Sequence, residues 1–93
     1  MRKFELISLE EAKRLAMEKD SIVVDLRSRE EFYQGHIENA MNLPDGNMRE
    51  IDHFNKKNHT WILYCRRGSL SFKLASEMSQ KGYHVMAVIG GYR

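Results

Sequence analysis

Short apolar runs alternate along the chain with stretches whose apolar residues recur at helical spacing. Residues 22–26, 61–64 and 85–89 form continuous runs rich in β-branched and aromatic side chains, which is typical of strands covered on both faces. A shorter run at residues 40–43 stops at Pro44, which cannot donate to a strand ladder. These runs predict strands, and the continuity of residues 22–26 places that strand inside the sheet.

Helices are predicted from their capping residues. In three places a side chain that accepts backbone N–H groups is followed three residues later by a glutamate. These pairs are Ser8 and Glu11, Ser28 and Glu31, and Asn47 and Glu50. A left-handed Gly35 is expected to close the second helix. A fourth helix with one apolar stripe is predicted to begin at Ser69 or Ser71 and to end near Gly82.

Strands and helices therefore alternate through the whole sequence. This order predicts an α/β fold, with a small open parallel sheet of about five strands, right-handed crossovers and helices on both faces. At 93 residues the chain has room for one core, so we expect a single domain over residues 1–93.

The chain contains one cysteine, Cys65, between the apolar run 61–64 and the fourth helix. In an open parallel sheet this is the edge where ligands bind. The helix N-terminus offers unpaired N–H groups and a partial positive charge, to which Arg66 and Arg67 add two full charges. Such a setting favours the thiolate, which is the reactive form of cysteine. A lone cysteine after an apolar strand is also often a small buried hydrophobe, but two adjacent arginines favour the reactive thiol.

Composition narrows the classes of function. The formal net charge is only +2, and the basic residues are too scattered for a nucleic-acid surface. The N-terminal residues lack the apolar stretch of a signal peptide or a membrane span, and a single cysteine forms no internal disulfide. We therefore expect a soluble, cytoplasmic protein that binds neither nucleic acid nor membrane. No pair of histidines or cysteines has metal-ligand spacing, so we expect no metal and no cofactor.

Asp25 and Arg27 follow the interior strand, at the same predicted edge as Cys65. They are expected either to hold loops together through charge-assisted hydrogen bonds or to touch the ligand, and we favour the structural role.

Two segments of the sequence resemble a known family. Residues 23–44 and 64–91 together are similar to a single-domain rhodanese, a sulfurtransferase. The motifs are D-x-R, E-[FY]-x-x-G-H-I and N-[IL]-P, carried by Asp25, Arg27, Glu31, Phe32, Gly35, His36, Ile37, Asn42 and Pro44. The resemblance implies a rhodanese-like fold. It also implies that Cys65 attacks the outer sulfur of a donor such as thiosulfate and carries it as a persulfide to a thiophilic acceptor.

The resemblance also implies roles for other residues. The loop after the cysteine would cradle the persulfide and bind the anionic donor. Its residues are Arg66, Arg67, Gly68, Ser69, Leu70 and Ser71. Asp25, Arg27 and His36 are expected to support it. The implied partners are a small anionic sulfur donor and a cyanide or thiol acceptor, including a thioredoxin-like protein.

Two features depart from the family pattern. Leu70 stands where many relatives place arginine, serine or threonine, so a polar contact to the donor is missing. Relatives also continue past the double glycine into a closing helix, whereas this sequence stops at Tyr92 and Arg93. We therefore expect that helix to be absent and an apolar patch to be exposed, to which Val88 and the helix beneath it contribute. Such patches often mark an association surface, and we expect a monomer or a weak homodimer.

Two other functions remain open beside sulfur transfer. One is a non-catalytic binding or regulatory module of the same fold, in which Cys65 performs no turnover. The other is a phosphatase or arsenate reductase, since related folds clamp an oxyanion with an arginine six residues after the cysteine. That position is Ser71, which disfavours the phosphatase.

Overall fold

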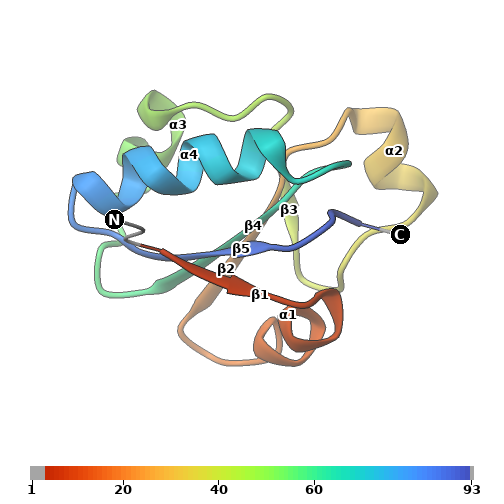
Figure 1. Ribbon diagram of the computed structural model, residues 1–93, viewed down its shortest axis with the longest axis horizontal. Coiled ribbons are helices and arrows are strands. Elements are labelled where there is room, and N and C mark those ends of the chain that lie inside the picture. The colour runs from red at the N-terminus through yellow and green to blue at the C-terminus, as the bar shows by residue number, and fades with distance from the viewer. Residues whose placement is uncertain (1–3, 93) are drawn as a thin grey trace.

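The computed structural model describes residues 4–92, which form a five-stranded parallel sheet with helices on both faces (Figure 1). The strands are β1 (Glu5–Ile7), β2 (Ser21–Asp25), β3 (Met41–Asn42), β4 (Thr60–Tyr64) and β5 (His84–Val88). The helices are α1 (Leu9–Leu15), α2 (Arg29–Gln34), α3 (Met48–Phe54) and α4 (Ser69–Gln80). The predicted fold class is thus confirmed.

The strand order is β1-β5-β4-β2-β3, and every neighbouring pair is parallel. Strand β2 is interior, as predicted, while β4 is the middle strand. All four apolar residues of β4 that precede the cysteine are fully buried. Cys65 therefore leaves the most enclosed strand of the sheet.

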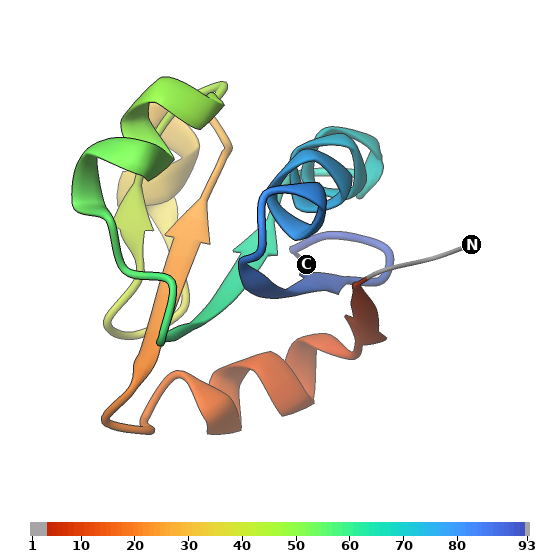
Figure 2. The same cartoon turned by 90° about the vertical axis from the view of Figure 1, so that its left-hand side faces the viewer.

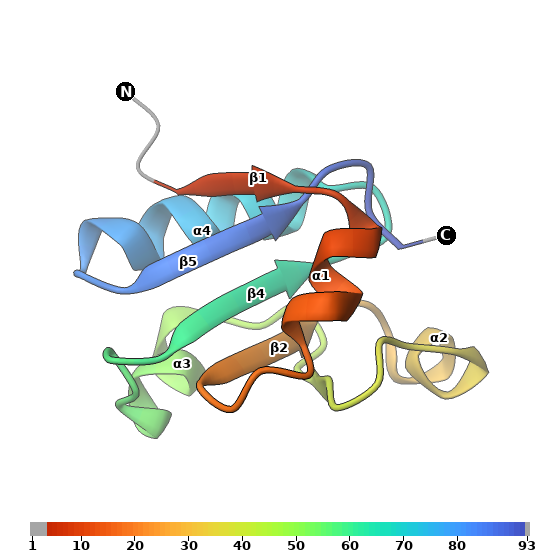
Figure 3. The ribbon, with the colours of Figure 1, turned by 90° about the horizontal axis from the view of Figure 1, so that it is seen from below.

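The helices divide between the two faces of the sheet. Helices α3 and α4 cover one face and α1 covers the other (Figures 2 and 3). Helix α2 buries no side chain completely and lies beyond the C-terminal ends of the strands (Figure 3). It is thus placed to contribute to the edge that carries Cys65. None of the helices within residues 4–92 has the length and apolar character to cross a bilayer.

The predicted capping residues act at three helix starts. Ser28 and Glu31 form a reciprocal capping box, while Ser8 and Asn47 each accept one backbone N–H of their helix. The expectation for Gly35 was wrong: its φ of 161° is extended rather than left-handed. Its carbonyl is instead held by Arg27, at 2.5 Å from Nη2.

The prediction that Val88 contributes to an exposed apolar patch was wrong, because Val88 is fully buried. It belongs to the core cluster beneath α1, against which Tyr92 also packs. Ile89, the next residue, is 56% exposed. Within the described residues no helix follows β5, and the chain covers this part of the sheet with an irregular segment instead.

The segment after β5 lies directly against the cysteine loop. Gly91 has a φ of +76°, and a Cβ built there would lie 2.1 Å from the carbonyl oxygen of Arg66. The N–H of Tyr92 donates to the carbonyl of Cys65 at 3.0 Å. Two stretches of main chain are therefore in contact at a distance that excludes any side chain.

We predict that Gly91→Ala destabilises the protein far more than Gly82→Ala. Both glycines have positive φ, but a Cβ at Gly82 meets nothing within 4 Å. The left-handed backbone alone should cost Gly82→Ala about 1 to 2 kcal/mol. Gly91→Ala must also displace main-chain atoms, so its loss in urea unfolding should be at least about 3 kcal/mol. Equal losses would show that the close contact does not constrain the loop.

Candidate active site

Cys65 begins a short loop that connects β4 to the N-terminus of α4. The loop turns at Gly68, whose φ of +97° is a conformation that favours glycine. Gly68 is also the N-cap of α4, and no side chain caps this helix start. No capping side chain therefore occupies the first N–H groups of α4, which lie next to the cysteine.

The sulfur of Cys65 is held by this loop. Its Sγ accepts a hydrogen bond from the Gly68 N–H at 3.0 Å, and its thiol donates to Ser71 Oγ at 3.6 Å. Ser71 Oγ in turn donates to the Gly68 carbonyl at 2.9 Å. Ser71 is fully buried and Cys65 is 5% exposed. The side chain of Ser71 thus ties the loop together, at the position where an arginine would be needed to clamp an oxyanion.

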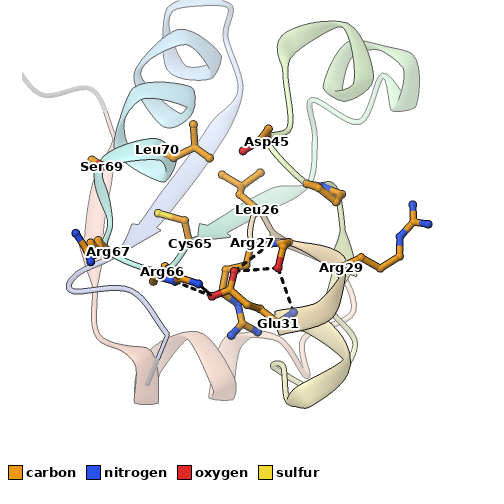
Figure 4. A pocket seen from close by; sticks show the side chains of 12 residues that line it. Leu26, Arg27, Arg29, Glu31, Asp45, Cys65, Arg66, Arg67, Ser69 and Leu70 are labelled. Carbon is orange, nitrogen blue, oxygen red and sulfur yellow. Dashed lines mark hydrogen bonds and ion pairs between the residues drawn. The ribbon is translucent and has the colours of Figure 1, made fainter.

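A pocket of about 700 Å³ opens beside Cys65 (Figure 4). It is lined by residues from the segments that follow β2, β3 and β4 and from the first turns of α2 and α4. They are Leu26, Arg27, Ser28, Arg29, Glu31, Pro44, Asp45, Cys65, Arg66, Arg67, Ser69 and Leu70. Four arginines and two carboxylates therefore line the pocket, so it is basic but not uniformly so.

Arg66 lies at the rim of the pocket and is paired with Glu31 of α2. The Nε and Nη2 of Arg66 lie 2.6 and 2.5 Å from Glu31 Oε2, and Figure 4 shows the two side chains meeting below Cys65. The hydrogen bond from Arg66 lowers the pKa of Glu31, against the opposing effect of burial. The pair therefore stays charged to lower pH than a free glutamate would allow. Arg67 is exposed.

Asp25 and Arg27 form a buried ion pair behind the pocket. Arg27 donates to the Asp25 carboxylate from its backbone N–H at 2.8 Å, from Nε at 3.1 Å and from Nη2 at 2.8 Å. The Asp25 side chain is fully buried and that of Arg27 is 8% exposed. The C-terminal end of β2 is thus closed by its own side chains.

The guanidinium of Arg27 also joins three other segments. It lies 4.2 Å from the ring centroid of Tyr92 and 5.5 Å from that of Tyr64, in cation–π geometry. It donates to the carbonyl of Gly35 after α2. Because Tyr92 also bonds to the carbonyl of Cys65, the ion pair reaches the cysteine loop through one intermediate residue.

His36 is not part of the Cys65 pocket. Its ring stacks on Phe32, with centroids 3.7 Å apart, and its Nδ1 lies 2.7 Å from the Phe32 carbonyl. It lines a separate hollow with Met17 and Tyr92. The arrangement gives His36 a local role at the end of α2 and no contact with the sulfur.

Several pocket residues were not singled out from the sequence. Glu31 was predicted as a capping residue and as part of a family motif, but neither it nor Leu26, Ser28, Arg29, Pro44 and Asp45 was placed in the site. Their common signal is position, since each lies just after β2 or β3 at the edge that carries Cys65. Within residues 4–92 no group of three or more His, Cys, Asp or Glu side chains is placed to hold a metal ion.

Residues 8–93 match the family described as Rhodanese-like domain. The chain belongs to this family. Over 90 residues it is 28% identical to the thiosulfate sulfurtransferase GlpE of Coxiella burnetii, covering 96% of this chain and 84% of the relative. It is 36% identical over 64 residues to the tRNA sulfurtransferase of Thermoplasma acidophilum, covering 69% of this chain but only 13% of that protein. The rhodanese-like chain thus corresponds to a small part of this second relative.

Solved structures agree with the assignment. The rhodanese-related protein of Thermoplasma volcanium superposes with a TM-score of 0.79 at 25% identity, covering 95% of this chain and 86% of that chain. The rhodanese-like fold predicted from the motifs is therefore confirmed. Its relatives include proteins named sulfurtransferases.

We predict that Asp25→Ala destabilises this rhodanese-like domain by about 3 kcal/mol, because breaking a buried ion pair leaves the partner charge uncompensated. Asp20→Ala, at an exposed position, is the matched control and should change stability by less than about 0.5 kcal/mol. Urea unfolding measures both. A variant of Asp25 with unchanged stability but no sulfur transfer would assign this residue to catalysis instead.

Proposed function

We propose that the protein is a sulfurtransferase that carries sulfane sulfur as a persulfide on Cys65. The Cys65 thiolate attacks the outer sulfur of a donor such as thiosulfate. A new S–S bond forms, the donor's S–S bond breaks, and sulfite leaves with the electron pair. A thiophilic acceptor, cyanide or a thiolate, then attacks the outer sulfur of the persulfide and releases the Cys65 thiolate.

The observation that carries this proposal is the bond from the Gly68 N–H to Cys65 Sγ at 3.0 Å. A backbone amide at a helix N-terminus stabilises negative charge on an acceptor without any rearrangement of side chains. The thiolate before attack and the persulfide after it are both anions on or next to this sulfur. The same loop therefore favours the charged form at each stage of the cycle.

The arginines of the pocket supply long-range attraction for an anionic donor. Arg27 and Arg66 are each paired with a carboxylate. Within residues 4–92, Arg29 and Arg67 form no ion pair, so their charges are not neutralised by a partner in contact. Both line the pocket, and we assign to them the larger share of donor attraction. Arg66 is expected to matter less than its place next to the cysteine indicates.

Oxyanion hydrolysis fits the loop less well than sulfur transfer. A phosphatase of this type needs a cation to neutralise the transferred group opposite the nucleophile. The corresponding residue, Ser71, is fully buried and its hydroxyl is engaged with the loop's own carbonyl. A persulfide needs no such clamp, because its single charge lies within reach of the amides.

Mass spectrometry after incubation with thiosulfate tests the proposal. The wild-type protein should gain the mass of one sulfur atom, and dithiothreitol should remove it. Cys65→Ser should gain nothing, whereas Ser76→Ala, a helix position outside the pocket lining, should load like the wild type. A wild-type protein that stays unmodified with thiosulfate and with organic persulfides would favour the non-catalytic binding module.

A further inference from the structure

The two sides of the Cys65 pocket differ in chemistry. Figure 4 shows Leu70 and Leu26 on one side of the cysteine and the Arg66–Glu31 pair on the other. In Figure 4 Asp45 also lies on the first side, beside Leu70, and Pro44, the residue before it, belongs to the pocket lining as well. We call Leu26, Pro44 and Leu70 the apolar wall. Apart from Cys65, these three are the lining residues with apolar side chains, and they share the pocket with the reactive sulfur.

The apolar wall is held in place by the core. Leu26 is 2% exposed, and a Cβ at Gly46 would lie 2.8 Å from its Cδ2, so the chain packs closely around it. The Leu26 N–H donates to the Tyr64 carbonyl at 2.9 Å, which fixes the end of β2 against β4. Leu70 is half-buried against the same core cluster and keeps part of its side chain on the pocket. The wall is therefore a preformed surface.

An apolar wall is unfavourable for a small, strongly hydrated dianion. Placing polar oxygens against it removes their water without returning hydrogen bonds. A carboxylate, Asp45, also lines the pocket, and another, Glu31, already holds Arg66. A ligand with one charge on sulfur and carbon atoms behind it is repelled less by these carboxylates than a dianion. Its sulfur can accept the Gly68 N–H while its carbon chain packs against the wall.

We infer that the apolar wall selects organic sulfur carriers, a thiol and its persulfide, over inorganic ones, and that Leu70 is the specificity-determining residue. The inference rests on the proposed function, because it concerns the exchange at Cys65. In that exchange an organic thiolate attacks the outer sulfur of the Cys65 persulfide. The new bond joins it to that sulfur, the bond to Cys65 breaks, and the Cys65 thiolate leaves with the electron pair. The reverse reaction loads the enzyme from the organic persulfide.

The test uses thiols that differ only in chain length. The protein is first loaded with sulfur, and its mass confirms the persulfide at time zero. The rate at which the Cys65 persulfide loses its outer sulfur is then measured with mercaptoethanol, mercaptobutanol and cyanide. Each rate is expressed per concentration of the reactive anion, thiolate or cyanide. A fully buried methylene should raise kcat/KM by about fourfold and a half-buried one by about twofold. Mercaptobutanol has two more methylenes than mercaptoethanol, and this open pocket should half-bury each. Wild-type protein should therefore prefer mercaptobutanol over mercaptoethanol by about fourfold.

The variants assign the preference to the wall. Leu70→Ser should reduce the preference for mercaptobutanol over mercaptoethanol to less than about twofold, because the thiol's methylenes lose their contact with the Leu70 side chain. It should also lower the ratio of the mercaptobutanol rate to the cyanide rate. Leu70→Met, which keeps the volume and the apolar character, should retain the preference. Met17→Ser is the control for a general loss of surface apolarity, because Met17 is 62% exposed and lies outside this pocket.

Each outcome decides something. Loaded protein with no chain-length preference, or an unchanged preference in folded Leu70→Ser, would overturn the inference and leave the proposed function intact. Failure of wild-type protein to load at all would overturn the proposed function, and the inference with it. Should Leu70→Ser fail to fold, the wild-type preference and its retention in Leu70→Met still decide whether carbon chains are selected.

Discussion

The contact between the main chain of Gly91 and that of Arg66 is the constraint on which the site depends. No side chain fits between these two stretches, so the irregular segment after β5 fixes the path of the loop after β4. The Tyr92 N–H bond to the Cys65 carbonyl fixes the same loop one residue earlier. With both held, Gly68 turns back at positive φ and its amide points at the sulfur. The cysteine is thus positioned by backbone.

Side chains mainly support this backbone. The buried Asp25–Arg27 pair joins β2 to the end of α2, and the Arg27 guanidinium lies over the ring of Tyr92. Replacing an ion pair of this kind with apolar residues is often tolerated in proteins, whereas removing one partner is not. Here the ion pair acts mainly on geometry, because it fixes the relative positions of three segments that support the cysteine loop.

Some arginines of the pocket pair with carboxylates and hold the structure, and the others are left to attract an anion. Two of its four arginines are paired with carboxylates, so adjacency to Cys65 in the sequence is a poor guide to which cation an incoming anion meets. Arg66 is next to the cysteine and faces Glu31, while Arg29 comes from α2 and has no acidic partner within residues 4–92. The site therefore has a modest positive field and an apolar wall, the combination from which we infer a preference for a ligand with one charge and a carbon chain.

Much of the fold could be predicted from the sequence. The order of the elements, the interior place of β2 and the position of Cys65 at the carboxyl edge follow from local patterns and short connections. What escaped prediction depends on contacts between distant residues. Glu31 and Arg66 are 35 residues apart, and nothing local to either indicates that they meet. The burial of Val88 was missed because it shares a cluster with Ala12 of α1 and with Ala16, the C-cap of that helix, and Tyr92, beyond the last strand, also packs against this cluster.

We propose that the backbone of the cysteine loop stabilises the charge of the bound sulfur. The most direct measurement is the amide spectrum of ¹⁵N-labelled protein before and after loading with sulfur, with the load confirmed by mass. The account predicts that the Gly68 amide shifts strongly, because its acceptor changes, while the amide of Gly82, at the far end of α4, stays in place. Loaded protein in which the Gly68 amide does not move would contradict it.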